Sequence, residues 1–214
     1  MTTTPPPDPT DSLNSPSPSL ASPSLASASA SAASSSDSPG PVRIRPCLPT
    51  DLDILERHMP SPGRTRRHAD RFDRQEQGLT TFLTAWIDDV PVGTAQILWQ
   101  GCAAPEVQAR FPGCPELNGL GIWPPDLRSR GIGTALIRAV EQRVREAGHD
   151  LIGLGVDDDN PRAAALYLRI GYRETGCRYL DRYAYLDADG VRQEVADPAR
   201  FLVRSLGEAS AGPE

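Results

Sequence analysis

The chain contains no lysine, and all 22 of its cationic side chains are arginines. P-loop phosphotransfer, Schiff-base catalysis and serine–lysine hydrolysis each require a lysine, so these three classes of enzyme are excluded. Histidine is also scarce, at three residues, and no His-Glu-x-x-His motif of a zinc protease is present. Apolar runs are short, and the N-terminal segment lacks the basic start and apolar stretch of a secretion signal. We therefore expect a cytoplasmic protein that contacts no membrane.

Cysteine is limited to Cys47, Cys102, Cys114 and Cys177, and no two of them form a Cys-x-x-Cys pair. This spacing favours four reduced thiols, and a bridge between Cys102 and Cys114 is the alternative. No spacing of cysteine and histidine indicates a metal site, and we expect no metal. The acidic run 157–159 precedes a predicted helix, and we interpret it as charge that stabilises the start of that helix.

Residues 1–41 lack aromatic and cationic side chains, and 32 of the 41 are serine, proline, alanine or threonine. Such a segment cannot bury enough apolar surface to offset its chain entropy, so we predict that it is disordered. One domain should follow over residues 42–207, with a flexible end at 208–214. Three acidic residues lie in the first segment, which leaves about half of the formal charge of −6 on the domain. So weak a negative charge argues against a nucleic-acid partner.

Hydrophobic periodicity within 42–207 predicts a mixed sheet with helices on its faces, an α/β (α+β) fold. Strands are predicted at 42–45, 80–87, 92–99, 117–123 and 151–156, then within 172–185 and at 201–203. Helices are predicted over about 51–58, 66–77, 131–147 and 163–170, and an irregular loop over 101–115.

The segment 128–134 carries the strongest chemical signal, because it joins a predicted strand to a long amphipathic helix. Its residues are Arg128, Ser129, Arg130, Gly131, Ile132, Gly133 and Thr134. Free N–H groups at a helix start bind an anion such as phosphate, glycine lets the backbone approach it, and arginine adds donors. A dinucleotide fingerprint would place a third glycine at Leu136, so a dinucleotide oxidoreductase is a weaker alternative. The second alternative is that 128–134 is a strand-to-helix turn that binds no ligand.

Together with a second block, Asn160-Pro161 through Tyr167 to Gly171-Tyr172, the sequence resembles the GNAT superfamily of N-acetyltransferases. Arg128-x-x-Gly131-x-Gly133 matches the pyrophosphate motif of that family, and the second block matches its Asn…Ala-x-x-Leu-Tyr-x-x-x-Gly-(Phe/Tyr) segment. The resemblance covers about 42–206 in element order. It implies a mixed, mostly antiparallel sheet of six or seven strands with about four helices.

The resemblance also implies acetyl-CoA as cosubstrate and direct attack by a primary amine in a ternary complex. The pyrophosphate should bind the N–H groups of 128–134, and the pantetheine should pair with the backbone near Ile122 and Trp123. Asn160 matches a residue that hydrogen-bonds the pantetheine, although asparagine before proline is also a good helix N-cap. A non-catalytic acyl-CoA-binding regulatory module on the same fold is the alternative function. Monomer and homodimer both fit the sequence.

Two residues match catalytic positions of the family. Tyr167 matches the general acid at the departing thiolate, and a core aromatic is the alternative. The pKa of a phenol is ~10 and that of a thiol is ~8.5, so complete proton transfer from Tyr167 to the thiolate costs roughly 2 kcal/mol. We therefore expect Tyr167 to stabilise the thiolate by a hydrogen bond. Glu116 matches the place of a catalytic base. The alternatives are an exposed strand-end carboxylate and an ordered water as base.

The segment 57–74 contains six arginines and two aspartates, a net charge of about +4. The family fold places its first two helices beside the acceptor channel. A cationic wall there predicts an amine acceptor that also carries an anionic group. Arginines that face solvent or pair with nearby carboxylates are the alternative.

Overall fold

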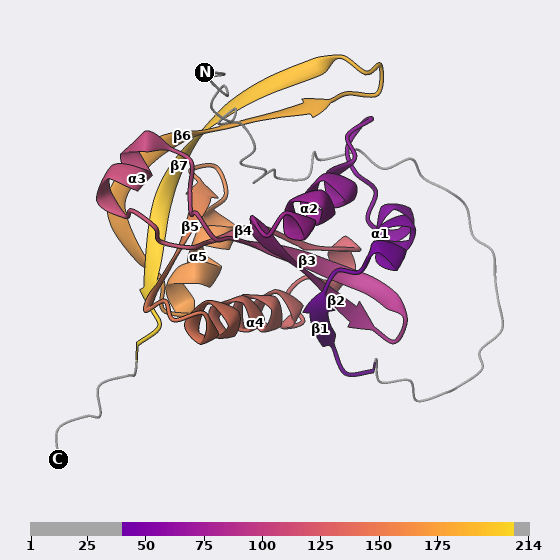
Figure 1. Cartoon of the computed structure of the whole chain (residues 1–214), viewed down its shortest axis with the longest axis horizontal. Coiled ribbons are helices and arrows are strands. Elements are labelled where there is room, and N and C mark those ends of the chain that lie inside the picture. The colour runs from indigo at the N-terminus through magenta and orange to yellow at the C-terminus, as the bar shows by residue number, and fades with distance from the viewer. Residues whose placement is uncertain (1–39, 208–214) are drawn as a thin grey trace, which may run out of the picture.

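The alternating apolar segments form seven strands of a single sheet in a computed structural model that describes residues 40–207 (Figure 1). The predicted flexible segments 1–41 and 208–214 lie outside the described residues, except for Gly40 and Pro41. All the strands and helices fall within the predicted domain of 42–207. No helix in the described range has the length and apolar character of a membrane span.

The strands follow the order β1-β2-β3-β4-β5-β7-β6, and every neighbouring pair is antiparallel except β4 with β5. The strands are β1 (Arg43–Pro46), β2 (Thr80–Ile87), β3 (Val90–Leu98), β4 (Glu116–Ile122), β5 (Leu151–Asp157), β6 (Arg173–Leu186) and β7 (Arg192–Ser205). The helices are α1 (Leu52–His58), α2 (Arg67–Glu76), α3 (Pro105–Arg110), α4 (Ile132–Glu146) and α5 (Pro161–Arg169), with short 3-10 turns at Pro49–Asp51 and Pro125–Leu127. The predicted mixed, mostly antiparallel fold is confirmed.

The structure differs from the prediction in α3, which lies inside the predicted loop 101–115. Pro105 starts this six-residue helix, and Val107 alone among its residues is buried. One buried residue gives no periodicity, so the sequence pattern could not show the helix. The strands β6 and β7 are also longer than predicted, at 14 residues each.

Helices cover both faces of the sheet. Phe82 and Leu83 are neighbours in β2, so their side chains point to opposite faces. Leu83 belongs to the main core with Leu136 and Val140 of α4, and Phe82 packs with residues of α1 and α2. Tyr167 of α5 lies in the main core too. The α4–α5 face is thus opposed to an α1–α2 face.

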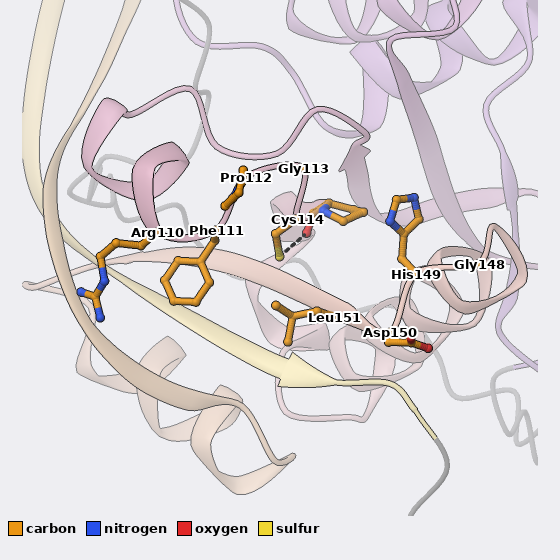
Figure 2. Close-up of a pocket in the computed structure, with 10 residues that line it drawn as sticks. Arg110, Phe111, Pro112, Gly113, Cys114, Gly148, His149, Asp150 and Leu151 are labelled. Atoms are coloured by element: carbon orange, nitrogen blue, oxygen red, sulfur yellow. Dashed lines mark hydrogen bonds between the residues drawn. The ribbon is translucent and has the colours of Figure 1, made fainter.

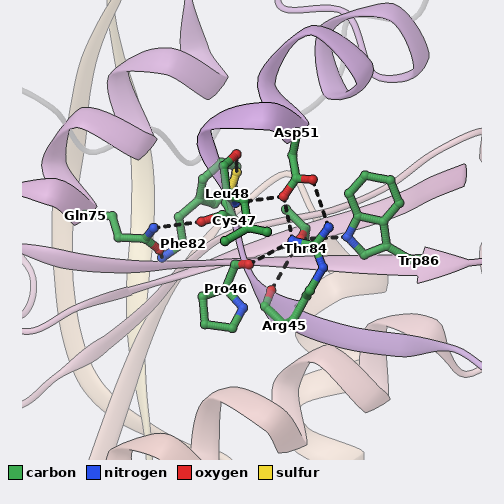
Figure 3. Close-up of polar contacts among 9 residues, drawn as sticks. All are labelled: Arg45, Pro46, Cys47, Leu48, Asp51, Gln75, Phe82, Thr84 and Trp86. Atoms are coloured by element: carbon green, nitrogen blue, oxygen red, sulfur yellow. Dashed lines mark hydrogen bonds and ion pairs between the residues drawn. The ribbon is translucent and has the colours of Figure 1, made fainter. Parts of the chain in front are cut away.

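Polar contacts fix α1 and α2 to the first two strands (Figure 3). The guanidinium of Arg45 donates to both carboxylate oxygens of Asp51 at 2.6 and 2.8 Å. The Gln75 amide donates to the Cys47 carbonyl at 3.0 Å and accepts from the Phe82 N–H at 2.9 Å. The Arg45–Asp51 pair thus holds the turn before α1 against β1, and the two Gln75 bonds hold α2 over the sheet.

The sheet opens between β4 and β5, which pair only at Glu116 and Gly153. On its other side β4 stays paired with β3, through a bulge between Asn118 and Gly121. Within this bulge Gly119 has a φ of +60°, and a Cβ there would collide with the Arg71 guanidinium. The bulge bends β4 at the point where the two strands part.

Candidate functional site

A cleft of about 1150 Å³ lies where β4 and β5 part. One wall is formed by residues 59–63 and by α2, and the floor by residues 119–123 of β4 and the following turn. The opposite wall combines residues from the segment 128–134, the end of β5 and α5. Nine of the twelve residues singled out from the sequence line this one cleft. They are Ile122, Trp123, Arg128, Ser129, Gly131, Gly133, Thr134, Asn160 and Tyr167.

The segment before α4 has the features of an anion site. Gly131 caps the helix with a φ of +87°, and the first N–H groups of α4 have no carbonyl partner within the helix. Ser129 also has a positive φ of 64°, and its hydroxyl accepts from Arg162 at 2.8 Å. A Cβ at Gly133 would meet no protein atom closer than Ile122 Cγ1 at 4.0 Å. The space beside Gly133 is thus open for a ligand, and a diphosphate fits this cradle of N–H groups and arginines.

The two other residues of this segment do not line the cleft with their side chains. Arg130 is exposed and donates to the Asp126 carbonyl at 3.1 Å. Ile132 is buried in the main core. Only their backbone N–H groups can serve the predicted pyrophosphate site.

One edge of β4 faces the cleft. The Trp123 N–H donates to the Val92 carbonyl at 3.0 Å, so the other edge remains joined to β3. Beyond Glu116, no described strand pairs with the edge that faces β5. Such an edge can pair with an extended ligand that carries amide groups.

Asn160 acts as the N-cap of α5, because its Oδ1 accepts from the Ala163 N–H at 3.1 Å. The same residue lines the cleft. The capping role is therefore confirmed, and the contact with pantetheine stays a prediction.

Tyr167 reaches the cleft from α5, although only 7 % of its surface is exposed. Its ring packs edge-on against Tyr172, with centroids 5.9 Å apart. Burial raises the pKa of Tyr167, and the nearby Asp157 carboxylate raises it further. The hydroxyl therefore stays protonated and can donate a hydrogen bond into the cleft.

Glu116 is not exposed, so the alternative of an exposed carboxylate at the end of a strand is wrong. The side chain is buried, and Asn118 Nδ2 donates to its Oε1 at 3.2 Å. Burial raises the pKa of Glu116 to about 7. It is not among the residues that line the cleft. Its role as a base stays a prediction.

The arginine-rich segment 57–74 contributes only two of its arginines to the cleft, Arg67 and Arg71. His68 lies between them, and its Nε2 is 2.7 Å from the Met59 carbonyl. Burial lowers the pKa of His68, which keeps its ring neutral near pH 7. The two arginines thus supply the positive charge of this wall.

Asp157 is the cleft residue that the sequence interpretation misplaced. It is the last residue of β5, and α5 starts only at Pro161, with no acidic residue in its first turn. The residue is 5 % exposed and lines the cleft, and its Oδ1 has no hydrogen-bond partner. Burial raises the pKa of Asp157 to about 6, and Asp197 adds to this effect. The one sequence signal for placing Asp157 in β5 is that the alternating pattern of the strand continues past Val156.

A second hollow of about 380 Å³ lies at the opposite end of β5 (Figure 2). The Cys114 thiol there turns toward the Pro115 carbonyl, 3.6 Å away, and burial raises its pKa to about 11. A protonated thiol is a poor nucleophile. All four cysteines are buried and free. In the described range no three potential metal ligands come together.

Comparison with known proteins points to one family. The profile of the Acetyltransferase (GNAT) family matches residues 51–172. A mycothiol acetyltransferase from Clavibacter sepedonicus is 42 % identical over 62 residues, which are 29 % of this chain and 20 % of that protein. The chain thus matches about a fifth of the length of this relative.

Solved structures share the fold. An N-acetyltransferase from Staphylococcus aureus Mu50 aligns with a TM-score of 0.57 at 14 % identity, over 78 % of this chain and 99 % of that one. An acetyltransferase of the GNAT family from Desulfovibrio desulfuricans aligns with a TM-score of 0.56 at 20 % identity, over 78 % of this chain and all of the other.

Proposed function

The chain belongs to the acetyltransferase (GNAT) family, and on that premise we propose that it transfers an acetyl group from acetyl-CoA to a primary amine. One observation carries the proposal. A single cleft joins an anion cradle at the start of α4 to a buried tyrosine hydroxyl at the opening of the sheet.

Acetyl-CoA would supply an acetyl thioester. The N–H groups of Gly131, Ile132, Gly133 and Thr134, with Arg128, would hold its diphosphate. The β4 edge near Ile122 and Trp123 would pair with the amides of its pantetheine arm, beside Asn160. This arrangement would direct the thioester toward Tyr167.

The acceptor must lose a proton before it attacks. An alkylamine of pKa ~10.4 is almost fully protonated at pH 7, and its neutral form lies roughly 4.6 kcal/mol higher. A base is therefore required, and Glu116 or an ordered water is the predicted one. The amine nitrogen then forms a bond to the carbonyl carbon, and the carbon–sulfur bond breaks. The amine loses its second proton, sulfur gains one, and the net reaction releases one proton.

Tyr167 would stabilise the departing thiolate by donating a hydrogen bond. Because the pKa of Tyr167 is raised, complete proton transfer to sulfur costs more than it would from an ordinary phenol. Hydrogen bonding to the developing charge, with the proton on sulfur finally taken from water, avoids that cost.

The experiment is a screen of primary amines with acetyl-CoA, in which a thiol reagent detects the free CoA. Burial raises the pKa of Cys47 and Cys102 to about 12, so the thiols of the protein should react slowly and add little background. We expect amine-dependent release of thiol. Binding of acetyl-CoA by calorimetry without turnover of any amine would instead indicate a non-catalytic acyl-CoA-binding module. Binding of a nicotinamide dinucleotide would contradict both.

A further inference from the structure

Two side chains of opposite charge lie on the cleft and form no salt bridge within the described residues. Asp157 ends β5, and its Oδ1 has no hydrogen-bond partner although the residue is 5 % exposed. Arg67 begins α2 and forms no ion pair with any described carboxylate. A charge that is removed from water without a partner costs free energy, so each group is suited to meet its partner on a ligand.

Asp157 lies beside the expected position of the reacting thioester. Val156 packs in the α4 core, so Asp157, the next residue of the strand, points toward the opposite face, on which α2 lies. Its carboxylate is close enough to Tyr167 to raise the pKa of that hydroxyl. The other charged groups that act on Asp157 are Asp158, Asp159 and Asp197, and all three are acidic. Asp158 is neutralised by ion pairs with Arg178 at 2.6 Å and Arg200 at 3.3 Å, whereas Asp157 has no such pair in the described range and can attract a cation from a ligand.

Arg67 lies on the facing wall. Its backbone N–H donates to the Ser61 hydroxyl at 3.1 Å, which ties the start of α2 to the segment 59–63. Its side chain is half-buried, which lowers the pKa of the guanidinium, and the Glu56 carboxylate opposes this shift; arginine stays charged at any physiological pH. Arg71 follows one turn later and lies against Gly119 at the β4 bulge. A guanidinium recognises carboxylate or phosphate through two parallel hydrogen bonds.

We propose that the acceptor is a zwitterion, a primary amine that also carries an oxyanion, with its ammonium held by Asp157 and its oxyanion by Arg67. This inference rests on the proposed acetyl transfer and adds the class of acceptor. Asp157 then takes the proton of the ammonium before the nitrogen attacks the thioester carbon. It is better placed for this step than Glu116, because Asp157 lines the cleft and Glu116 does not.

The test compares acceptors that carry the oxyanion with acceptors of similar size that lack it, each corrected for the fraction of neutral amine. Amino acids are paired with their carboxamides, phosphoethanolamine is paired with ethanolamine, and spermidine represents amines without an anion. We expect kcat/KM to be about 10- to 100-fold higher for the acid of a pair, the range for a hydrogen bond to a charged group. Preference within the first or the second pair identifies the oxyanion as carboxylate or phosphate.

Three variants assign this preference to residues. Arg67→Gln should abolish the preference of acid over amide, whereas the exposed Arg66→Gln, outside the cleft, should keep it. Asp157→Asn should lower kcat/KM for every amine by about 100-fold, the usual effect of losing a general base. It should also remove the fall of kcat/KM below about pH 6 that protonation of Asp157 causes. Acetyl-CoA affinity should be unchanged in all three, and none of them should lower the melting temperature; Asp157→Asn should raise it above pH 6, because the ionised carboxylate is then replaced by a neutral amide.

The outcomes separate this inference from the proposed function. Three results would overturn the proposal that the acceptor is a zwitterion. They are turnover without a preference for the acid, a preference for spermidine, and an unchanged preference for the acid in Arg67→Gln. Full activity of Asp157→Asn would overturn the proposal that Asp157 binds the ammonium group and takes its proton. If acetyl-CoA binds and no amine is acetylated, the proposed function fails, and the inference fails with it.

Discussion

The hydroxyl of Thr65 accepts a hydrogen bond from the backbone N–H of Leu186 at 2.9 Å. The Arg64 N–H also donates to the Leu186 carbonyl, at 3.0 Å. These contacts join the cleft wall at 59–63 to the far end of β6, in the hairpin that projects beyond the rest of the sheet (Figure 1). The hairpin thus supports, from outside, the wall of the cleft that we propose to contact the acceptor.

Loss of this support should affect the acceptor and spare the cofactor. Thr65→Val keeps the shape of the side chain but cannot accept the Leu186 N–H. We expect the KM for the amine to rise about 3- to 10-fold, in line with one hydrogen bond of ~1 kcal/mol, while the Kd for acetyl-CoA stays constant. Steady-state kinetics and calorimetry measure the two values. An equal loss of affinity for acetyl-CoA would show that the wall serves the cofactor instead.

Gly133→Val should weaken binding of the cofactor while the fold survives. A Cβ at Gly133 meets no protein atom closer than Ile122 Cγ1 at 4.0 Å, so the protein itself has room for a larger side chain. That side chain would occupy the diphosphate cradle, and we expect the Kd for acetyl-CoA to rise at least ~10-fold, or 1.4 kcal/mol. Arg138→Ala, on the exposed face of α4, is the control and should leave the Kd unchanged. Unchanged affinity in Gly133→Val would mean that the diphosphate binds elsewhere.

Tyr167→Phe removes one hydroxyl and preserves the packing against Tyr172. We expect kcat to fall roughly 10- to 1000-fold with the affinity for acetyl-CoA unchanged, the range for loss of an acid or a transition-state donor. Tyr172→Phe removes a hydroxyl from the same ring pair outside the cleft, and should retain kcat. Equal rates for the two variants, under conditions where chemistry limits turnover, would reduce Tyr167 to a core residue.

Glu116 should make the fold sensitive to pH. Its pKa is about 7 in the folded chain and lower when unfolded, so the folded state retains a proton that the unfolded state has released. Stability therefore falls as pH rises through this window. Glu116→Gln should be more stable than the wild type at pH 8, on the order of 1 to 3 kcal/mol, and nearly equal to it at pH 5. Urea unfolding at the two pH values measures the difference in the free energy of unfolding between Glu116→Gln and the wild type. A difference that is the same at both pH values would contradict the raised pKa of Glu116.

Local patterns were sufficient to predict those residues of the cleft lining whose position depends on one segment. The glycines of 128–134 and the capping Asn160 act through backbone geometry, which neighbouring residues determine. The placement of Asp157 and Arg67 depends on contacts between distant segments. Whether Asp157 belongs to a strand or a helix start depends on how far β5 runs beside β7, and which of the six arginines line the cleft depends on how α2 packs over the sheet. A net charge of +4 over 57–74 could indicate a cationic wall but not that Arg67 and Arg71 are the arginines in it.

The most direct test of the acetyl-CoA site is the structure of the chain crystallised with acetyl-CoA. We expect the diphosphate on the N–H groups at the start of α4, and the thioester sulfur within hydrogen-bonding distance of the Tyr167 hydroxyl. A diphosphate bound elsewhere, or a sulfur remote from Tyr167, would contradict the account.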